Sequence, residues 1–244
     1  RMTMDWRGET VWRLHLDAAA FGRPLPGLPD SAPALPEIEE PDKDDARRFR
    51  VRTLAPGIHF IGEGATYQLF VEFRDFVVAL GAVGGVEKRL GALRSLAGEK
   101  PLRYALVTHH HADHLEGIPA LVDAGAVLVA SPAHEGVIRE AAGPDRAPRF
   151  AHVEDRRRIT DGTRSLVFQE IGPMRHAEHM LAAWIPEEQL LFSADLFVQP
   201  PGRPVRAANP PIRDLLSAIE RLELDVTRLV DTHSPVVSNL ADLR

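Results

Sequence analysis

The distribution of apolar and polar residues changes near residue 50. From Gly57 onward, short β-rich runs stand between turn residues, first over Ile58 to Ile61, then over Gln68 to Phe73 and Phe76 to Leu80. Runs of this length, rich in β-branched and aromatic residues, are typical of strands. We therefore predict that the main body of the protein begins with antiparallel strands.

Strands and helices alternate after these runs. Val86, Leu90, Leu93 and Leu96 have the spacing of one helix face, which predicts a helix from about Val86 to Leu96. Alternation of the two element types favours an α/β layered architecture. The further predicted strands are 102–107, 127–130, 165–171, 180–185, 190–193 and 228–230, and the further predicted helices lie near 117–124, 133–142 and 212–222.

The first 50 residues have a different composition. Six prolines lie between Pro24 and Pro41, and an acidic cluster follows up to Asp45. Such a segment is expected to be extended, without a core of its own. We predict an N-terminal appendage over residues 1–50 and one main domain over residues 51–244. Apolar side chains before Pro24 predict packing of this appendage on the main body or on a neighbouring subunit, and hence a possible homo-oligomer; they are Trp6, Val11, Trp12, Leu14, Leu16 and Phe21.

Composition excludes several classes of function. The chain of 244 residues has a net charge of −6 and no dense Lys/Arg stripe, which disfavours a nucleic-acid partner. No apolar run approaches the length of a membrane span, so a soluble globular protein without a membrane partner is expected. No secretory signal is visible, which predicts a cytoplasmic location, although the initial Arg1 indicates that the true N-terminus is missing or altered.

The sequence contains no cysteine, and this limits the chemistry of any metal site. Disulfides, thiolate ligands and a cysteine nucleophile are all excluded. A bound metal must therefore be held by nitrogen and oxygen atoms.

A concentration of such atoms follows the predicted strand 102–107, in the run His109-His110-His111-Ala112-Asp113-His114. Alternating residues such as His109 and His111 can point to one side, and a following turn can return Asp113 and His114 toward the same place. Open α/β sheets place their sites at the carboxyl ends of strands. A solvated histidine-rich loop is the alternative, but the spacing and the preceding strand favour a metal site.

The run Thr108 to His114 resembles the His-x-His-x-Asp-His signature of the metallo-β-lactamase-fold hydrolases. Three later segments, over about residues 55 to 240 in all, are similar to further motifs of that family. This resemblance implies an αββα sandwich with two mixed β-sheets flanked by helices. The three segments are Gly172 to His176, Pro186 to Asp195, and Asp231 to Pro235.

The resemblance also implies a ligand set for two metal ions. A first ion would be held by His109, His111 and His176, and a second by Asp113, His114 and His233, while Asp195 would bridge the two. Imidazole nitrogen and carboxylate oxygen suit zinc, and also iron or manganese. Two zinc ions are therefore the expected cofactors, with iron or manganese as alternatives.

Three departures from the family pattern affect the expected site. The family often has Asp after its early core strand, where this chain has Gly81, so a supporting carboxylate is expected to be absent. Bulky Leu115 and Glu116 follow the histidine motif. His179 replaces a small residue and is a candidate hydrogen-bond donor to substrate, with a surface histidine as the alternative. Other histidines are expected to point away from the ions or to be structural or solvated; they are His15, His59, His110, His134 and His152.

Two metal ions that share a water molecule lower its pKa and present hydroxide near pH 7. We expect this hydroxide to attack the carbonyl of a small ester, lactone, thioester or amide, including a β-lactam, with Asp113 orienting it and passing its proton to the leaving group. Alternatives are an iron-dependent oxidoreductase of the persulfide dioxygenase or flavodiiron kind and a non-catalytic metal-stabilised binding module. A nuclease is disfavoured by the acidic charge and by the 19 residues from His176 to Asp195, which leave no room for an inserted nucleic-acid-binding domain.

Overall fold

The structure, a computed structural model, describes residues 2–6, 9–14, 49–198 and 209–243. The chain divides into two compact units, Arg1–Glu40 and Pro41–Arg244, which are described separately here. In the first unit, β1 (Met2–Trp6) pairs antiparallel with β2 (Glu9–Leu14). The appendage over residues 1–50 and its expected packing concern side chains that lie outside the described residues, so both stay predictions.

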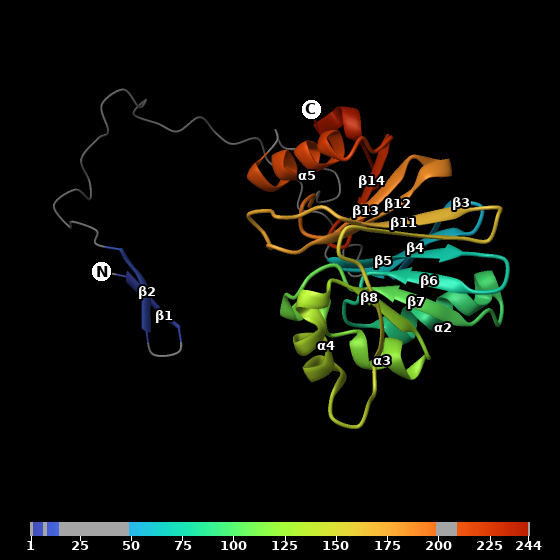
Figure 1. Cartoon of the computed structure of the whole chain (residues 1–244), viewed down its shortest axis with the longest axis horizontal. Coiled ribbons are helices and arrows are strands. Elements are labelled where there is room, and N and C mark those ends of the chain that lie inside the picture. Colours follow the sequence, from blue (N-terminus) through green and yellow to red (C-terminus); the bar gives the residue numbers. More distant parts are fainter. Residues whose placement is uncertain (1, 7–8, 15–48, 199–208, 244) are drawn as a thin grey trace. The chain divides into compact units, whose positions relative to one another are not determined.

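The second unit begins with a mixed sheet of seven strands that lie in chain order (Figure 1). Its first four strands pair antiparallel, as the sequence predicts, and its last four pair parallel. The parallel half carries the histidine motif immediately after its second strand. In order, the strands are β3 (Arg50–Ala55), β4 (Ile58–Glu63), β5 (Thr66–Glu72), β6 (Val77–Leu80), β7 (Leu102–Leu106), β8 (Val127–Ala130) and β9 (Arg149–His152).

The other sheet of this unit has six strands, again in chain order. All neighbours pair antiparallel except the fourth and fifth strands, which are parallel, so this sheet is also mixed. The strands are β10 (Arg156–Thr160), β11 (Ser165–Glu170), β12 (Leu181–Ile185), β13 (Leu190–Ser193), β14 (Arg228–Asp231) and β15 (Ser238–Asn239).

Helices cover the outer face of each sheet. Apolar side chains of α2 (Val86–Ala97), α3 (Ile118–Asp123) and α4 (Glu135–Ala142) pack on the seven-stranded sheet, and those of α5 (Pro210–Arg221) pack on the six-stranded sheet. Figure 1 shows the resulting order of layers, helix, sheet, sheet, helix. The predicted αββα sandwich is confirmed.

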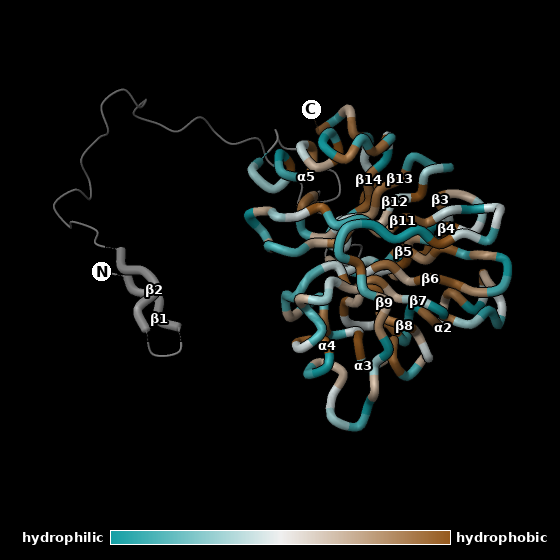
Figure 2. Tube along the Cα trace, viewed as in Figure 1, coloured by the Kyte–Doolittle hydropathy of each residue, from teal (hydrophilic) through white to brown (hydrophobic). Residues whose placement is uncertain are grey.

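Strand alternation explains why the sheets stack in this way. In β5, Tyr67, Leu69 and Val71 belong to the core between the sheets, while Phe70 belongs to the core under the helices. Successive side chains of a strand point to opposite faces of the sheet. A strand with apolar residues at both odd and even positions must therefore be covered on both faces. Brown segments accordingly recur along the central strands in Figure 2.

The sequence did not predict strands β3, β9, β10 and β15. β10 shows the reason, since it reads Arg156-Arg157-Arg158-Ile159-Thr160 and lies at the end of the six-stranded sheet. An edge strand that is mostly exposed buries little apolar surface, so its sequence has no alternating apolar pattern from which a strand could be predicted. Its pairing with β11 comes from backbone hydrogen bonds, which any sequence can form.

Phe168, in β11, is fully buried between the sheets, so its truncation tests the assigned core. We expect Phe168→Ala to lower the free energy of unfolding by about 3–5 kcal/mol, because it removes buried apolar area and leaves a cavity. Urea unfolding followed by circular dichroism would measure this. Val51→Ala, at a side chain that is 44% exposed, is the control and should change the value by less than about 0.5 kcal/mol. Equal changes in the free energy of unfolding for the two variants would contradict the assignment of Phe168 to the core.

Candidate metal centre

The strand ends place the predicted ligands at one edge of the sandwich. β7 ends at Leu106 and leads through Thr108 into the histidine motif, while the parallel strands β13 and β14 end two residues before Asp195 and His233. His176 lies in the loop between β11 and β12. The structure brings all seven predicted ligand residues together, in two groups of possible metal ligands.

The first group contains His109, His111, His176 and Asp195. The Nε2 atoms of His109 and His176 are 3.1 Å apart. Asp195 Oδ2 lies 2.8 Å from His176 Nε2 and 3.2 Å from His109 Nε2. One candidate ligand atom from each of the four side chains lies within 4.8 Å of the others.

The second group contains Asp113, His114 and His233. The Nε2 atoms of His114 and His233 are 3.2 Å apart. Asp113 Oδ2 lies 3.2 Å from His233 Nε2 and 3.5 Å from His114 Nε2. His114 is fully buried, whereas the side chain of Asp113 is 52% exposed.

Asp195 connects the two groups. Its Oδ1 lies 3.0 Å from His233 Nε2, and its Oδ2 lies 3.0 Å from His114 Nε2 as well as near His109 and His176. One carboxylate therefore contacts imidazoles of both groups, which is the geometry of a bridging ligand.

This donor set fits divalent cations. The Nε2 atoms of His109 and His176 are 3.1 Å apart, which is close to the separation of about 3.3 Å between two ligands that each lie about 2.0 Å from a tetrahedral zinc ion. His114 Nδ1 is buried and has no hydrogen-bond partner among the described residues. Nitrogen and oxygen donors of this kind suit zinc, iron and manganese alike.

Burial and charge shift the pKa values of the ligands in opposite directions. Burial lowers the pKa of His109 to about 4, despite the opposing hydrogen bond to Asp195. The hydrogen bond to Asp195 raises the pKa of His233 to about 9, against the effect of burial. Burial opposes ionisation of Asp195, but hydrogen bonds from His109, His114 and His233 hold its pKa far below the usual range. Asp195 is therefore ionised at neutral pH.

A backbone carbonyl orients His233. Its Nδ1 donates to the carbonyl oxygen of Ala65 at 2.8 Å, which leaves Nε2 free to face the ligands. The adjacent Thr66 is held by Arg89 of α2, whose Nη2 donates to the carbonyl oxygen at 3.0 Å and to Oγ1 at 2.8 Å. Arg89 is 2% exposed and also donates to the carbonyl oxygen of Gly84. A metal-binding histidine commonly donates a hydrogen bond from the nitrogen that does not face the metal, as His233 Nδ1 does here to Ala65.

Glu170 organises the loop that carries His176. Its Oε1 accepts hydrogen bonds from the backbone amides of Gly172 at 2.9 Å and Met180 at 2.8 Å. These two residues stand on either side of His176, so the carboxylate fixes both ends of the loop. Arg221 of α5 adds a hydrogen bond to the carbonyl oxygen of Ile171 at 3.0 Å.

Backbone hydrogen bonds join the two halves of the sandwich beside the ligands. The amide of Leu181 donates to the carbonyl oxygen of Thr108 at 2.9 Å, and the amide of Tyr67 donates to that of Thr232 at 2.8 Å. Each bond ties a residue next to a ligand in one sheet to the other sheet. The spacing between the histidine motif and the later ligands is thus set by backbone contacts.

The departures from the family pattern have structural consequences. Gly81 has φ +93°, and a Cβ there would lie 3.3 Å from Phe192 and 3.6 Å from Thr232 Oγ1, so no carboxylate extends from this position. At Gly117, a Cβ would lie 2.5 Å from the carbonyl oxygen of Val83, and this close approach requires glycine. Leu115 packs on the core under the helices.

His179 belongs to a second cluster of imidazoles beside the centre. Its side chain is 45% exposed, and its Nδ1 lies 3.9 Å from Glu170 Oε2. The rings of His110 and His179 lie 5.2 and 6.1 Å from that of His134, whose pKa burial lowers to about 4. The role of His179 toward substrate stays a prediction.

Sequence reasoning missed three residues that support the ligands, namely Arg89, Glu170 and Asp231. Asp231 is fully buried and lies at the end of β14, and its carboxylate accepts the backbone amides of both Asp195 and His233. A charged residue at the end of an apolar strand was the available signal for Asp231 and Glu170. Arg89 had no such signal, because it lies within a helix that the sequence predicts as amphipathic.

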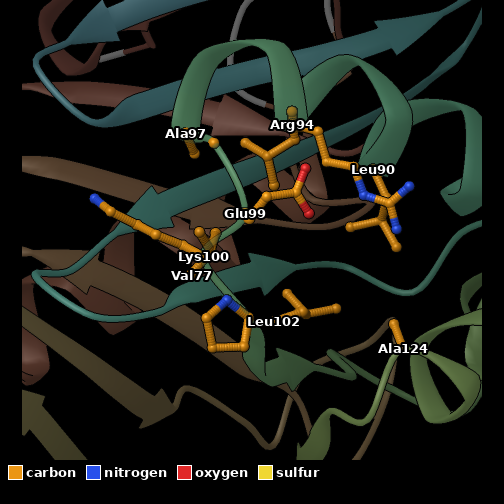
Figure 3. Close-up of a pocket in the computed structure, with 11 residues that line it drawn as sticks. Val77, Leu90, Arg94, Ala97, Glu99, Lys100, Leu102 and Ala124 are labelled. Atoms are coloured by element: carbon orange, nitrogen blue, oxygen red, sulfur yellow. The ribbon is translucent and has the colours of Figure 1, made fainter.

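A cavity of about 230 Å³ lies away from the ligands (Figure 3). It is lined by residues at the end of α2 and the start of β7, including Arg94, Lys100 and Leu102. Ligands of the metal centre follow the carboxyl ends of the strands, whereas this cavity lies at the amino end of β7. It is therefore separate from the candidate centre.

Comparison with known proteins assigns the family. The model of the metallo-beta-lactamase superfamily matches residues 62–233, which include all seven candidate ligands. The chain belongs to the metallo-β-lactamase superfamily, most of whose members are enzymes.

Individual relatives are distant. The chain is 23% identical over 214 residues to the "Beta-lactamase-like protein 2 homolog" of Caenorhabditis elegans, covering 86% of this chain and 69% of that protein. A metallo-beta-lactamase from Pontibacter korlensis is similar in structure, with 18% identity, a TM-score of 0.59 and coverage of 80% of this chain and 94% of the other. The rubredoxin oxygen:oxidoreductase of Desulfovibrio gigas has 18% identity and a TM-score of 0.64, over 79% of this chain and 58% of its own.

No helix within the described part of the chain has both the length and the apolar character needed to cross a membrane.

Metal binding at this centre should release a proton. His233, with its pKa raised to about 9, is protonated at pH 7.5 in the metal-free protein and must become neutral to bind a cation. We expect His233 to contribute about one proton to the release on zinc binding at pH 7.5, beside the proton of metal-bound water, and the apparent affinity to fall at least tenfold per unit as the pH is lowered from 8 to 7. Calorimetric titration in buffers of different ionisation enthalpy measures the release.

His109 provides the internal comparison, because its pKa of about 4 leaves it neutral at pH 7.5 and able to bind without releasing a proton. In His233→Asn, the release should fall by about one proton per chain. Unchanged release in that variant would contradict the role of His233.

Proposed function

We propose that this chain is a metal-dependent hydrolase that binds two divalent cations, with zinc the expected metal, and cleaves a small ester, lactone, thioester or amide, β-lactams included. One observation carries this proposal: the Asp195 carboxylate lies within 3.2 Å of ring nitrogens from both ligand groups. A carboxylate between two histidine clusters suits a pair of cations, because its negative charge reduces their mutual repulsion.

The residues divide into two ligand sets under this proposal. His109, His111 and His176 would hold one cation, and Asp113, His114 and His233 the other, with Asp195 shared. Bound cations would lower the pKa of water at the site toward neutrality and polarise the carbonyl oxygen of a substrate. Asp195, whose pKa stays low, supplies a fixed negative charge throughout.

Asp113 is the proposed proton carrier. Its side chain is half exposed while its Oδ2 lies 3.2 Å from His233 Nε2, so it reaches both the ligands and the solvent side of the centre. A carboxylate in this position accepts the proton of the attacking water and delivers it to the leaving group. The exposed His179 is proposed as a hydrogen-bond donor to the substrate.

An iron-dependent oxidoreductase is the second candidate. Structural likeness to a rubredoxin oxygen:oxidoreductase favours it, and the nitrogen and oxygen donors accept iron as readily as zinc. Iron in the purified protein, together with oxygen consumption, would support this candidate and overturn the hydrolase. Retained metal with no turnover of either kind would support a binding module.

Removal and return of metal tests the proposal on the whole protein. We expect elemental analysis to find close to two zinc ions per chain and a chelator to abolish hydrolysis of ester, lactone, thioester or lactam substrates. Added zinc should restore it, because the folded chain retains its ligands. Hydrolysis that persists in the metal-stripped protein would contradict the proposal.

Substitution of single ligands gives a second test. His109→Ala and Asp113→Ala should each lower kcat/KM by at least a hundredfold, because the first loses a buried ligand and the second the proton carrier. His152→Ala is the matched control, since that histidine pairs with Glu135 at 3.0 Å outside the ligand groups. Activity near the parent level in His109→Ala would refute the site.

A further inference from the structure

Asp231 is a fully buried carboxylate at the end of β14. Burying a carboxylate is costly unless its oxygens accept hydrogen bonds. Ser193, the last residue of β13, is paired with Asp231 across the two parallel strands. The carboxylate therefore lies where these two strands end and where the chain turns toward two of the ligands.

Both oxygens of Asp231 accept hydrogen bonds from the ligand loops. Oδ1 accepts the backbone amide of Asp195 at 3.1 Å and that of His233 at 3.0 Å. Oδ2 accepts Ser193 Oγ at 3.0 Å and the backbone amide of Phe197 at 3.3 Å. One side chain thus holds the loop after β13 and the loop after β14 at the same time.

The backbone at Asp195 needs such support. Its φ of 63° lies in the left-handed region, which costs a non-glycine residue free energy that the surroundings must offset. Within this loop, Asp231 binds the backbone amide of Asp195 itself and that of Phe197, two residues later. Loss of the carboxylate would free the loop to relax and would move the Asp195 side chain.

Movement of Asp195 matters because its oxygens contact four imidazoles at 2.8–3.2 Å. Metal–ligand distances tolerate only a few tenths of an ångström.

We propose that Asp231 is a positioning residue, which sets the distance between Asp195 and His233 and thereby the affinity of the second ligand group for its cation. This inference rests on the proposed function, because it takes the two groups to be metal sites. Asp231 acts through the backbone amides of two ligands and does not itself touch the cations. Gly81 offers no carboxylate to this region, so the support comes from the other sheet.

Zinc titration of the full chain, with a competing chelator, tests this proposal. Asp231→Asn keeps the size of the side chain and one acceptor oxygen but replaces the other acceptor with a donor. We expect it to weaken binding of one of two zinc equivalents by 10- to 100-fold, the usual effect of altering a group that orients a ligand, and to weaken the other less. Ser165→Ala, at a buried serine of β11 that contacts Arg158, is the control and should bind zinc as the parent does.

The unfolding midpoint in the presence of chelator separates positioning from simple stabilisation. A lower midpoint with parent affinity for both zinc equivalents would overturn the inference while leaving the proposed function intact. A parent protein that binds no zinc would overturn both.

Hydrogen exchange on the metal-free parent covers the case in which Asp231→Asn does not fold. The inference predicts slow exchange of the amide protons of Asp195 and His233, because both are bound to Oδ1. Rapid exchange of either proton, measured by NMR, would overturn the inference.

Discussion

Convergence of four imidazoles on the Asp195 carboxylate is the constraint on which this structure depends. Imidazole nitrogens 3.1–3.2 Å apart repel one another unless a proton or a cation lies between them. In the metal-free chain, the ion pair of protonated His233 with Asp195 offsets part of this repulsion, which is why the pKa of His233 is high. The cores on both faces of each sheet fix the strand ends from which the donor loops extend.

Burial of the donors is uneven, and this gives the centre a closed side and an open side. His109 and His114, at the two ends of the histidine motif, are fully buried, whereas Asp113 is half exposed. Asp113 therefore marks the open side of the centre. That arrangement suits a reaction at the solvent side of the centre, and burial keeps His109 neutral and available as a ligand, as its low pKa shows.

Support for the ligands comes from both sheets and from a helix. Glu170 fixes the loop of His176, Asp231 joins the loops of Asp195 and His233, and Arg89 holds the turn whose carbonyl accepts His233 Nδ1. Such partners orient the side chains that bind a metal directly and fix which nitrogen of each imidazole faces the metal. The donor types leave zinc and iron equally suitable, so the choice between hydrolysis and oxidoreduction depends on metal identity and on the surroundings of the site.

The sequence by itself determined the central strands, the four helices and the α/β class, because burial on one or both faces leaves a periodic apolar pattern, while the αββα sandwich followed from the resemblance of its motifs to the family. It also located the ligands, since His109 to His114 are adjacent in the chain and the later segments resemble family motifs. Edge strands such as β10 left no pattern, because they bury little apolar surface. Tertiary structure alone decided the roles of Arg89, Glu170 and Asp231: their partners are backbone groups brought near by folding, and a backbone amide or carbonyl is the same at every position of a sequence.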